Sequence, residues 1–211
     1  MQTTYDKKLR LAERHLKSAC PKLREWIAES GKCSLTPEWS REPVESLVRA
    51  VAHQQLHGKA AASILGRLVA RYPMQTFPTP QQLSRMRTPT LRACGFSAAK
   101  TEAIRGIAKG QVAGCVPNRA DANGMTDAQL IAKLTELRGI GTWTVEMLLI
   151  FTMGRLDIMP MDDFGVRAGL THLYSLETVP KKADFALWTN QWAPYRSIGA
   201  WYLWRLADAR K

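Results

Sequence analysis

The sequence lacks the cysteine spacing of a metal-binding or disulfide-rich protein. Its four cysteines, Cys20, Cys33, Cys94 and Cys115, are scattered along the chain, and no two of them stand at metal-ligand spacing. This distribution argues against a zinc site, an iron–sulfur cluster and a disulfide framework, and it is typical of proteins in a reducing compartment. We therefore expect no cofactor of these kinds.

The sequence also lacks a signal peptide and any apolar stretch long enough to cross a membrane. We expect a protein that makes no membrane contact and works inside the cell. It would be cytoplasmic, associated with the nucleoid if the source is bacterial and nuclear if the source is eukaryotic.

Acidic residues are scarce relative to basic ones. The chain of 211 residues has 18 Asp and Glu against 30 Lys and Arg, which gives a formal net charge of +12. Such an excess favours a polyanionic partner, with nucleic acid as the leading candidate. On charge alone, a basic surface without a specific partner is the alternative.

Runs of alternating β-branched residues are absent, and apolar residues recur instead at helical spacing. Residues 43–55 begin with Pro43, which suits a first helical turn, and they carry one apolar face. Ser97 can cap the helical run that ends near Gly110. Residues 126–137 open with Thr126 and Gln129 at the spacing of a capping box. We predict an all-α protein of about ten helices joined by short polar turns.

Two glycines, Gly139 and Gly141, interrupt the helical stretch LRGIGTWTVEMLLIF, residues 137–151. Glycine is a poor helix former, so the pair predicts a sharp turn between a helix ending at Leu137 and another starting near Thr142. Such a turn leaves backbone N–H groups uncovered at the start of the second helix, where the helix dipole also attracts negative charge. The stretch predicts an anion site of phosphate size, with a plain helix turn as the alternative.

Two adjacent carboxylates, Asp162 and Asp163, follow in the stretch PMDDFGVR. In order and spacing, the hairpin and these acids resemble the helix–hairpin–helix DNA glycosylase superfamily (HhH-GPD). More closely, the chain is similar to the 3-methyladenine DNA glycosylase II branch, which removes alkylated bases. The resemblance runs from residues 34–61 through the hairpin to residues 193–205, and it covers most of the chain.

The resemblance implies two helical subdomains, with double-stranded DNA and the extruded alkylated base in the cleft between them. Residues 44–160 would form the central subdomain, with the helix–hairpin–helix at about residues 128–153. Residues 1–43 and 161–211 would together form the other subdomain. For an enzyme of this kind we expect a monomer.

The catalytic aspartate of this branch falls on Asp163. Breaking an N-glycosidic bond develops positive charge on the sugar, which a nearby carboxylate stabilises while it orients a water. A base methylated on a ring nitrogen is already cationic and leaves with little protonation, so one essential carboxylate suffices. We expect Asp162 to act in structure or at the helix start. The alternative is that both acids only cap the helix that follows.

Lyase members of the superfamily carry a lysine two residues after the second hairpin glycine, and this chain has Trp143 there. Tryptophan offers no amine for a Schiff base, so the resemblance implies a monofunctional glycosylase that leaves an abasic site and an intact strand. Trp143 and Trp204 would instead stack on a cationic base, beside Met147 where one relative carries a pocket tyrosine. Core packing is the alternative for both tryptophans.

The polar turn AHQQLHGKAA, residues 52–61, ends an otherwise apolar helix. In the family this turn fills the gap left by the flipped base, and Gln55 and His57 are the expected plug residues. Metal binding by His53 and His57, four residues apart, is a competing idea without a recognisable third ligand.

The remaining expected contacts belong to the hairpin. The positions expected to bind DNA are Gly139, Gly141 and Thr144. Relatives hold a structural sodium or potassium ion at backbone carbonyls of the hairpin. The matching carbonyls in this chain are those of Thr135, Leu137 and Ile140.

Two other functions stay open at this point. A non-catalytic helix–hairpin–helix DNA-binding protein would keep the hairpin but would need neither Asp163 nor the pocket tryptophans. A bifunctional lyase would need a lysine at another position, because Trp143 stands where lyase members carry theirs. For the glycosylase, 3-methyladenine, 7-methylguanine, ethenoadenine and deaminated purines are all open as substrates.

Overall fold

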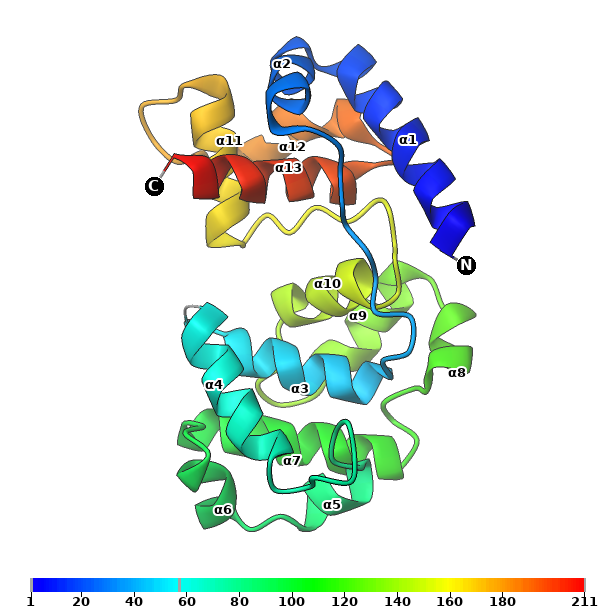
Figure 1. Ribbon diagram of the computed structural model, residues 1–211, viewed down its shortest axis with the longest axis vertical. Coiled ribbons are helices and arrows are strands. Elements are labelled where there is room, and N and C mark those ends of the chain that lie inside the picture. The colour runs from blue at the N-terminus through cyan, green and yellow to red at the C-terminus, as the bar shows by residue number, and fades with distance from the viewer. Residues whose placement is uncertain (1, 57, 211) are drawn as a thin grey trace. The chain divides into compact units, whose positions relative to one another are not determined.

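The computed structural model describes residues 2–56 and 58–210, which are largely helical (Figure 1). Within these ranges there are thirteen α-helices, two short 3-10 helices and no strand, so the all-α prediction is confirmed. The chain forms two compact units: unit 1 comprises Met1–Pro37 with Gly154–Lys211, and unit 2 comprises Glu38–Met153. No helix in the described ranges is both long and apolar enough to span a membrane.

Unit 1 is built around the C-terminal helix. Its largest fully buried side chains include Trp192 and Tyr202, so the aromatic residues near the C-terminus form much of its core. The indole N–H of Trp26 donates to the carbonyl of Tyr202 at 2.9 Å and joins the N-terminal segment to that helix. The helices of unit 1 are α1 (Gln2–Ala19), α2 (Pro21–Ser30), α11 (Phe164–Tyr174), α12 (Phe185–Thr189) and α13 (Arg196–Ala209).

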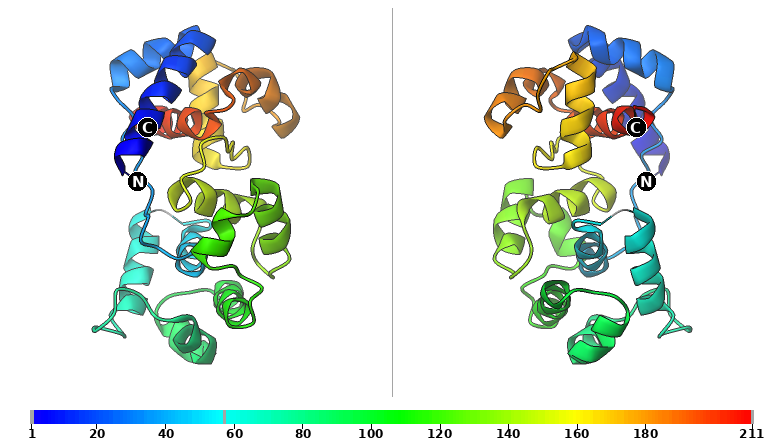
Figure 2. Two further views of the ribbon diagram at one scale, coloured as in Figure 1. Left: turned by 90° about the vertical axis from the view of Figure 1, so that its right-hand side faces the viewer. Right: turned by 90° about the vertical axis from the view of Figure 1, so that its left-hand side faces the viewer.

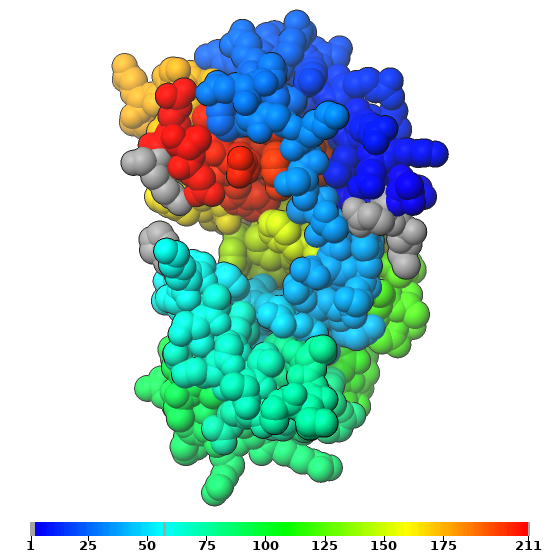
Figure 3. All heavy atoms as spheres, viewed as in Figure 1, coloured from blue at the N-terminus to red at the C-terminus, as the bar shows by residue number. Residues whose placement is uncertain are grey.

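Helix α11 crosses α13 at close range, as Figures 1 and 2 show. Gly169 makes this approach possible, because a Cβ atom at that position would lie 2.1 Å from the carbonyl oxygen of Leu203. On another face of α13, helix α2 lies beside it at the surface (Figure 3).

The segment before α11 is bound to the start of α13. The guanidinium of Arg196 donates to both carboxylate oxygens of Asp157, at 2.7 Å and 2.9 Å. These hydrogen bonds hold the pKa of Asp157 below its ordinary value. The backbone N–H of Ile158 donates to the hydroxyl of Ser197 at 2.9 Å. Residues 154–160 therefore belong to unit 1, whereas the predicted boundary lay after residue 160.

The described residues of unit 2 form eight α-helices around an aliphatic core that includes Leu47, Leu68, Ile104 and Ile107. Its helices are α3 (Pro43–His53), α4 (Gly58–Val69), α5 (Pro80–Arg85), α6 (Thr88–Ala93), α7 (Ala98–Val112), α8 (Arg119–Asn123), α9 (Asp127–Thr135) and α10 (Thr142–Phe151).

The capping signals read from the sequence are present in unit 2. Pro43 occupies the first turn of α3, and the hydroxyl of Ser97 accepts the N–H of Lys100 at the start of α7. Thr126 and Gln129 form the predicted reciprocal capping box of α9. These contacts satisfy backbone donors that a helix start leaves without partners.

The chain enters unit 2 earlier than predicted, after Pro37 rather than after residue 43. The N–H of Glu38 donates to the carbonyl of Phe151 at 2.9 Å, and Arg119 donates to the carbonyls of Thr152 and Glu38 at 3.2 Å each. Because these bonds are to residues of unit 2, the segment before α3 belongs to that unit.

Gly169→Ala should destabilise unit 1. Its methyl group would collide with backbone rather than with a flexible side chain, so α11 and α13 must separate, and we expect a loss of at least about 2 kcal/mol. Denaturant unfolding followed by circular dichroism measures this. The control is Gly106→Ala in α7, where a Cβ would meet nothing within 4 Å. Equal stability of the two variants would contradict the close contact.

Candidate active site and nucleic-acid interface

The predicted hairpin lies between α9 and α10, inside unit 2. Helix α9 ends at Thr135 with Glu136 as its C-cap, two residues before the predicted end at Leu137, because the chain turns through short-range bonds there. Helix α10 starts at Thr142, as predicted, and Gly141 is its N-cap residue.

The two hairpin glycines serve different purposes. Gly139 has φ of +83°, a left-handed conformation that other residues rarely adopt, and a Cβ there would lie 2.9 Å from the Cβ of Ala103. Gly141 has φ of −95°, and a Cβ there would meet nothing within 4 Å. The fold thus requires glycine at residue 139, whereas at 141 it would accept alanine.

The start of α10 is exposed at Gly141 and Thr142, and no side chain caps it. The amides of Thr144 and Val145 bond to the carbonyl of Gly141, so they belong to the helix itself. The amides before them point along the positive end of the helix dipole, which suits a phosphate. This geometry fits the anion site predicted from the glycine pair.

Trp143 and Met147 are four residues apart on α10 and therefore lie on the same face of the helix. Both side chains are partly exposed, while Val145, Leu148 and Leu149 are buried in the core of unit 2. The two predicted pocket residues thus project from the less buried face of α10.

The prediction that Thr144 contacts DNA needs correction as far as its side chain is concerned. Thr144 is 1% exposed, and its hydroxyl accepts the side-chain amide of Gln54 at 3.0 Å. The same amide nitrogen also donates to the carbonyl of Gly139 at 3.1 Å. The Thr144 side chain therefore ties the hairpin to the end of α3 instead of facing a phosphate.

The predicted plug turn follows α3. Gln55 is exposed and has φ of +55°, a strained conformation for a residue other than glycine. The ammonium of Lys100 donates to the carbonyls of Ala52 and Gln54, at 2.9 Å and 2.7 Å. Burial lowers the pKa of Lys100. Sequence reasoning missed this lysine, because nothing in the local sequence links α7 to the end of α3.

The second plug residue, His57, lies outside the described residues. In the described chain no group of three His, Cys, Asp or Glu side chains stands close enough to hold a metal ion. Partial burial and the charges of Lys100 and Arg49 hold the pKa of His53 below its ordinary value. A neutral imidazole can bind a metal, but a third ligand for His53 is missing among the residues described.

The carbonyls expected to hold a monovalent cation lie where α9 ends. The last carbonyls of a helix receive no hydrogen bond from an amide of a following helical turn. Their oxygens are ligands of the kind that bind sodium and potassium. The carbonyl of Leu137 accepts the N–H of Ile140 at 3.0 Å, and Thr135 is the last residue of α9. These positions remain a prediction.

Asp163 is the N-cap residue of α11, in unit 1. Its Oδ1 atom accepts the backbone N–H of Val166 at 2.9 Å and the indole N–H of Trp204 at 2.7 Å. The structure thus brings together two residues that were singled out separately, the predicted catalytic acid and a predicted pocket tryptophan. Both side chains are partly exposed, so a ligand can approach them.

Asp162 has a different environment. Its carboxylate pairs with the ammonium of Lys182 at 2.5 Å, and both side chains are at least half exposed. The helix start therefore belongs to Asp163 and not to Asp162, which corrects one of the two roles considered for Asp162. The pair is a surface contact that contributes little to stability.

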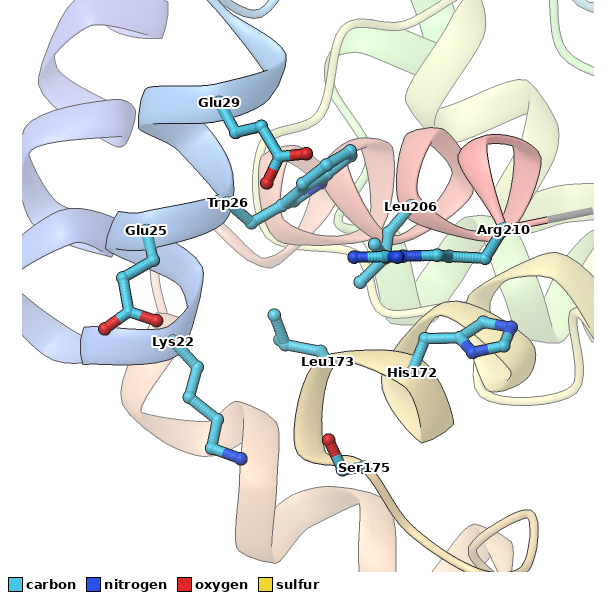
Figure 4. A pocket seen from close by; sticks show the side chains of 9 residues that line it. All are labelled: Lys22, Glu25, Trp26, Glu29, His172, Leu173, Ser175, Leu206 and Arg210. Atoms are coloured by element: carbon cyan, nitrogen blue, oxygen red, sulfur yellow. The ribbon is translucent and has the colours of Figure 1, made fainter.

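A separate surface hollow in unit 1 lies between α2 and the ends of α11 and α13 (Figure 4). Its lining mixes charges of both signs, with Lys22 and Glu25 from α2 and Arg210 from α13. None of the described residues that we predicted to act on DNA lines it. The candidate chemistry of unit 1 is therefore at Asp163 and not in this hollow.

A glycine-turned hairpin in one unit and a capped carboxylate beside an indole in the other define a helix–hairpin–helix protein with a candidate catalytic acid. The chain belongs to the HhH-GPD superfamily of base excision DNA repair proteins, whose family model matches residues 48–193. The family predicted from the sequence is thereby confirmed.

Individual relatives agree with this assignment. DNA-3-methyladenine glycosylase 1 of Schizosaccharomyces pombe is 43% identical over 174 residues, which cover 81% of this chain and 76% of that protein. The alkylbase DNA glycosidase-like protein mag2 of the same yeast is 34% identical over 202 residues, 95% of each chain. A solved structure of the S. pombe 3-methyladenine DNA glycosylase Mag1 in complex with abasic DNA superimposes with a TM-score of 0.87 and 39% identity, over 92% of this chain and 95% of that one.

The two hairpin glycines should respond differently to alanine. Gly139→Ala should destabilise the protein by about 1–2 kcal/mol, because it forces a left-handed backbone on a residue with a Cβ. Gly141→Ala should fold as the wild type does but bind duplex DNA more weakly, since its methyl group stands where a phosphate would approach. Thermal unfolding and binding to a short undamaged duplex at two salt concentrations measure both effects. Unchanged DNA binding by Gly141→Ala would remove the phosphate site from this turn.

Proposed function

We propose that this protein is a monofunctional DNA glycosylase of base excision repair. It removes alkylated purines of the 3-methyladenine type from double-stranded DNA and leaves an abasic site. The observation that carries the proposal is the Asp163 carboxylate, held by two donors at the start of α11 in a chain of the HhH-GPD superfamily. The two S. pombe relatives, named as glycosylases of alkylated bases, support the same substrate class.

DNA binding begins at the hairpin in this proposal. The start of α10 takes a backbone phosphate, and the net charge of +12 draws the duplex to the protein. The turn after α3, with Gln55 and His57, fills the space that the flipped base leaves. The protein acts as a monomer, and a structural sodium or potassium ion at the carbonyls after α9 would only steady the hairpin.

The reaction proceeds by breaking the bond between C1′ of the sugar and the purine nitrogen. Both bonding electrons leave with the base, which methylation has already made cationic, so the base departs neutral. The Asp163 carboxylate stabilises the positive charge on the sugar and takes a proton from the water that adds to C1′. No cofactor takes part in this scheme.

The side chains of the base pocket, Trp143, Trp204 and Met147, select the base. Trp143 and Met147 project from one face of α10, and an electron-rich indole attracts a cationic purine more strongly than a neutral one. Trp143 has no amine to attack the sugar, so the strand stays intact after base release. Relatives at 43% and 34% identity are named as a glycosylase and a glycosidase-like protein, which argues against the non-catalytic alternative.

Asp163→Asn tests the proposed catalytic role. Asparagine caps helices as well as aspartate does, so the bonds from Val166 and Trp204 should persist and the fold should survive. Loss of the negative charge should slow base release by at least about two orders of magnitude, the effect of removing one well-placed electrostatic group. Release of methylated base from a single-lesion duplex measures this.

Asp162→Asn is the matched control and should cost little, because it breaks only the exposed pair with Lys182. With the wild-type protein the strand should remain unbroken until alkali is added. Full activity of Asp163→Asn would refute the catalytic assignment, and strand breakage without alkali would refute the monofunctional one.

Gln55→Ala should lower excision from duplex DNA more than excision from a single strand carrying the same lesion, because the single strand needs less unstacking. His57→Ala should behave in the same way if both residues fill the gap. Single-turnover rates on the two substrates give the ratio. Equal losses on both substrates would point to a role in folding or in the base pocket instead.

A further inference from the structure

The Asp163 carboxylate is fixed from two different helices. The Val166 N–H belongs to the first turn of α11. A bond of this kind is expected at any helix start that an aspartate caps. The Trp204 indole N–H comes from α13, 41 residues along the chain, and reaches the same oxygen at 2.7 Å. The second bond is therefore a tertiary contact that the helix start alone does not provide.

Gly165 leaves the space through which this indole reaches the carboxylate. A Cβ at Gly165 would lie 2.7 Å from Cδ1 and 3.3 Å from Nε1 of Trp204, and 3.2 Å from Oδ1 of Asp163. Real Cβ atoms do not approach ring atoms to 2.7 Å, so the indole would have to move away from the acid. A methyl group at residue 165 would thus fill the space that the Trp204 edge occupies.

The backbone gives no other reason for glycine at this position. Gly165 lies inside α11 and is not among the residues with positive φ, so its conformation is open to alanine. Glycine is also a poorer helix former than alanine, which makes it unfavourable there on local grounds. Gly169, one turn later, sets the spacing of the two helix backbones, whereas the three atoms nearest to a Cβ at Gly165 would all be side-chain atoms.

We propose that Gly165 and Trp204 are positioning residues for Asp163: the missing side chain of Gly165 lets the indole N–H of Trp204 hold the carboxylate in the orientation used for catalysis. This inference rests on the proposed glycosylase function. Its physical reason is preorganisation, since a carboxylate held from two sides does not have to reorient when charge develops on the sugar.

A double-mutant cycle on excision tests the inference. Gly165→Ala displaces the indole, and Trp204→Phe keeps an aromatic ring but removes the N–H, so each should slow single-turnover base release about tenfold or more. The double variant should be about as slow as either single variant, because both changes break the same hydrogen bond. Affinity for undamaged duplex should stay unchanged in all three, and Gly106→Ala serves as the helical-glycine control.

A second readout does not depend on activity. The Trp204 indole N–H resonance, assigned by its loss in Trp204→Phe, should shift in Gly165→Ala and remain in place in Gly106→Ala. A wild-type rate for Gly165→Ala, single effects that multiply in the double variant, or an unmoved resonance would each overturn the inference. A wild-type protein that releases no alkylated base, with the resonance shifting as expected, would instead refute the proposed function and leave the contact standing.

Discussion

The close approach of α11 and α13 is the contact on which the candidate chemistry depends. Asp163 begins one of these helices and Trp204 lies on the other, so the distance between acid and indole follows from how near the two backbones come. Gly169 sets that distance, and the Asp157–Arg196 pair fixes the start of α13 to the segment that leads into α11. The orientation of the carboxylate is thus a property of helix packing rather than of a loop.

In unit 2, polar side chains hold the turn after α3 and the hairpin together. The single amide group of Gln54 bonds to the carbonyl of Gly139 and to the hydroxyl of Thr144, while Lys100 bonds to the last carbonyls of α3. The turn after α3 and the hairpin are therefore held as one piece. In the proposed function the turn would enter a base stack and the hairpin would hold a phosphate, and both would gain from a fixed spacing.

The long helices were predictable from the sequence because their signals are local. Pro43, Ser97 and the Thr126–Gln129 pair mark helix starts within four residues, and apolar spacing shows the buried face. About ten helices were predicted, without bounds for each, and thirteen α-helices are described. Three of these helices, α5, α8 and α12, have five or six residues, too few for a repeating apolar pattern.

The residues of the candidate site could be predicted one by one, but not their contacts, because these contacts join residues that are far apart in the sequence. Nothing local indicated that Trp204 would bond to Asp163, or that Thr144 would be buried against Gln54. The two hairpin glycines show most clearly what the sequence alone does not reveal, since both look alike in the stretch GIG. Only the dihedral angles and neighbours separate Gly139, which the turn needs, from Gly141, which the free protein does not need. Glycine suits the N-cap position of α10, and because it has no side chain it also leaves the amides at this helix start open to an anion, for which a phosphate group is the proposed ligand.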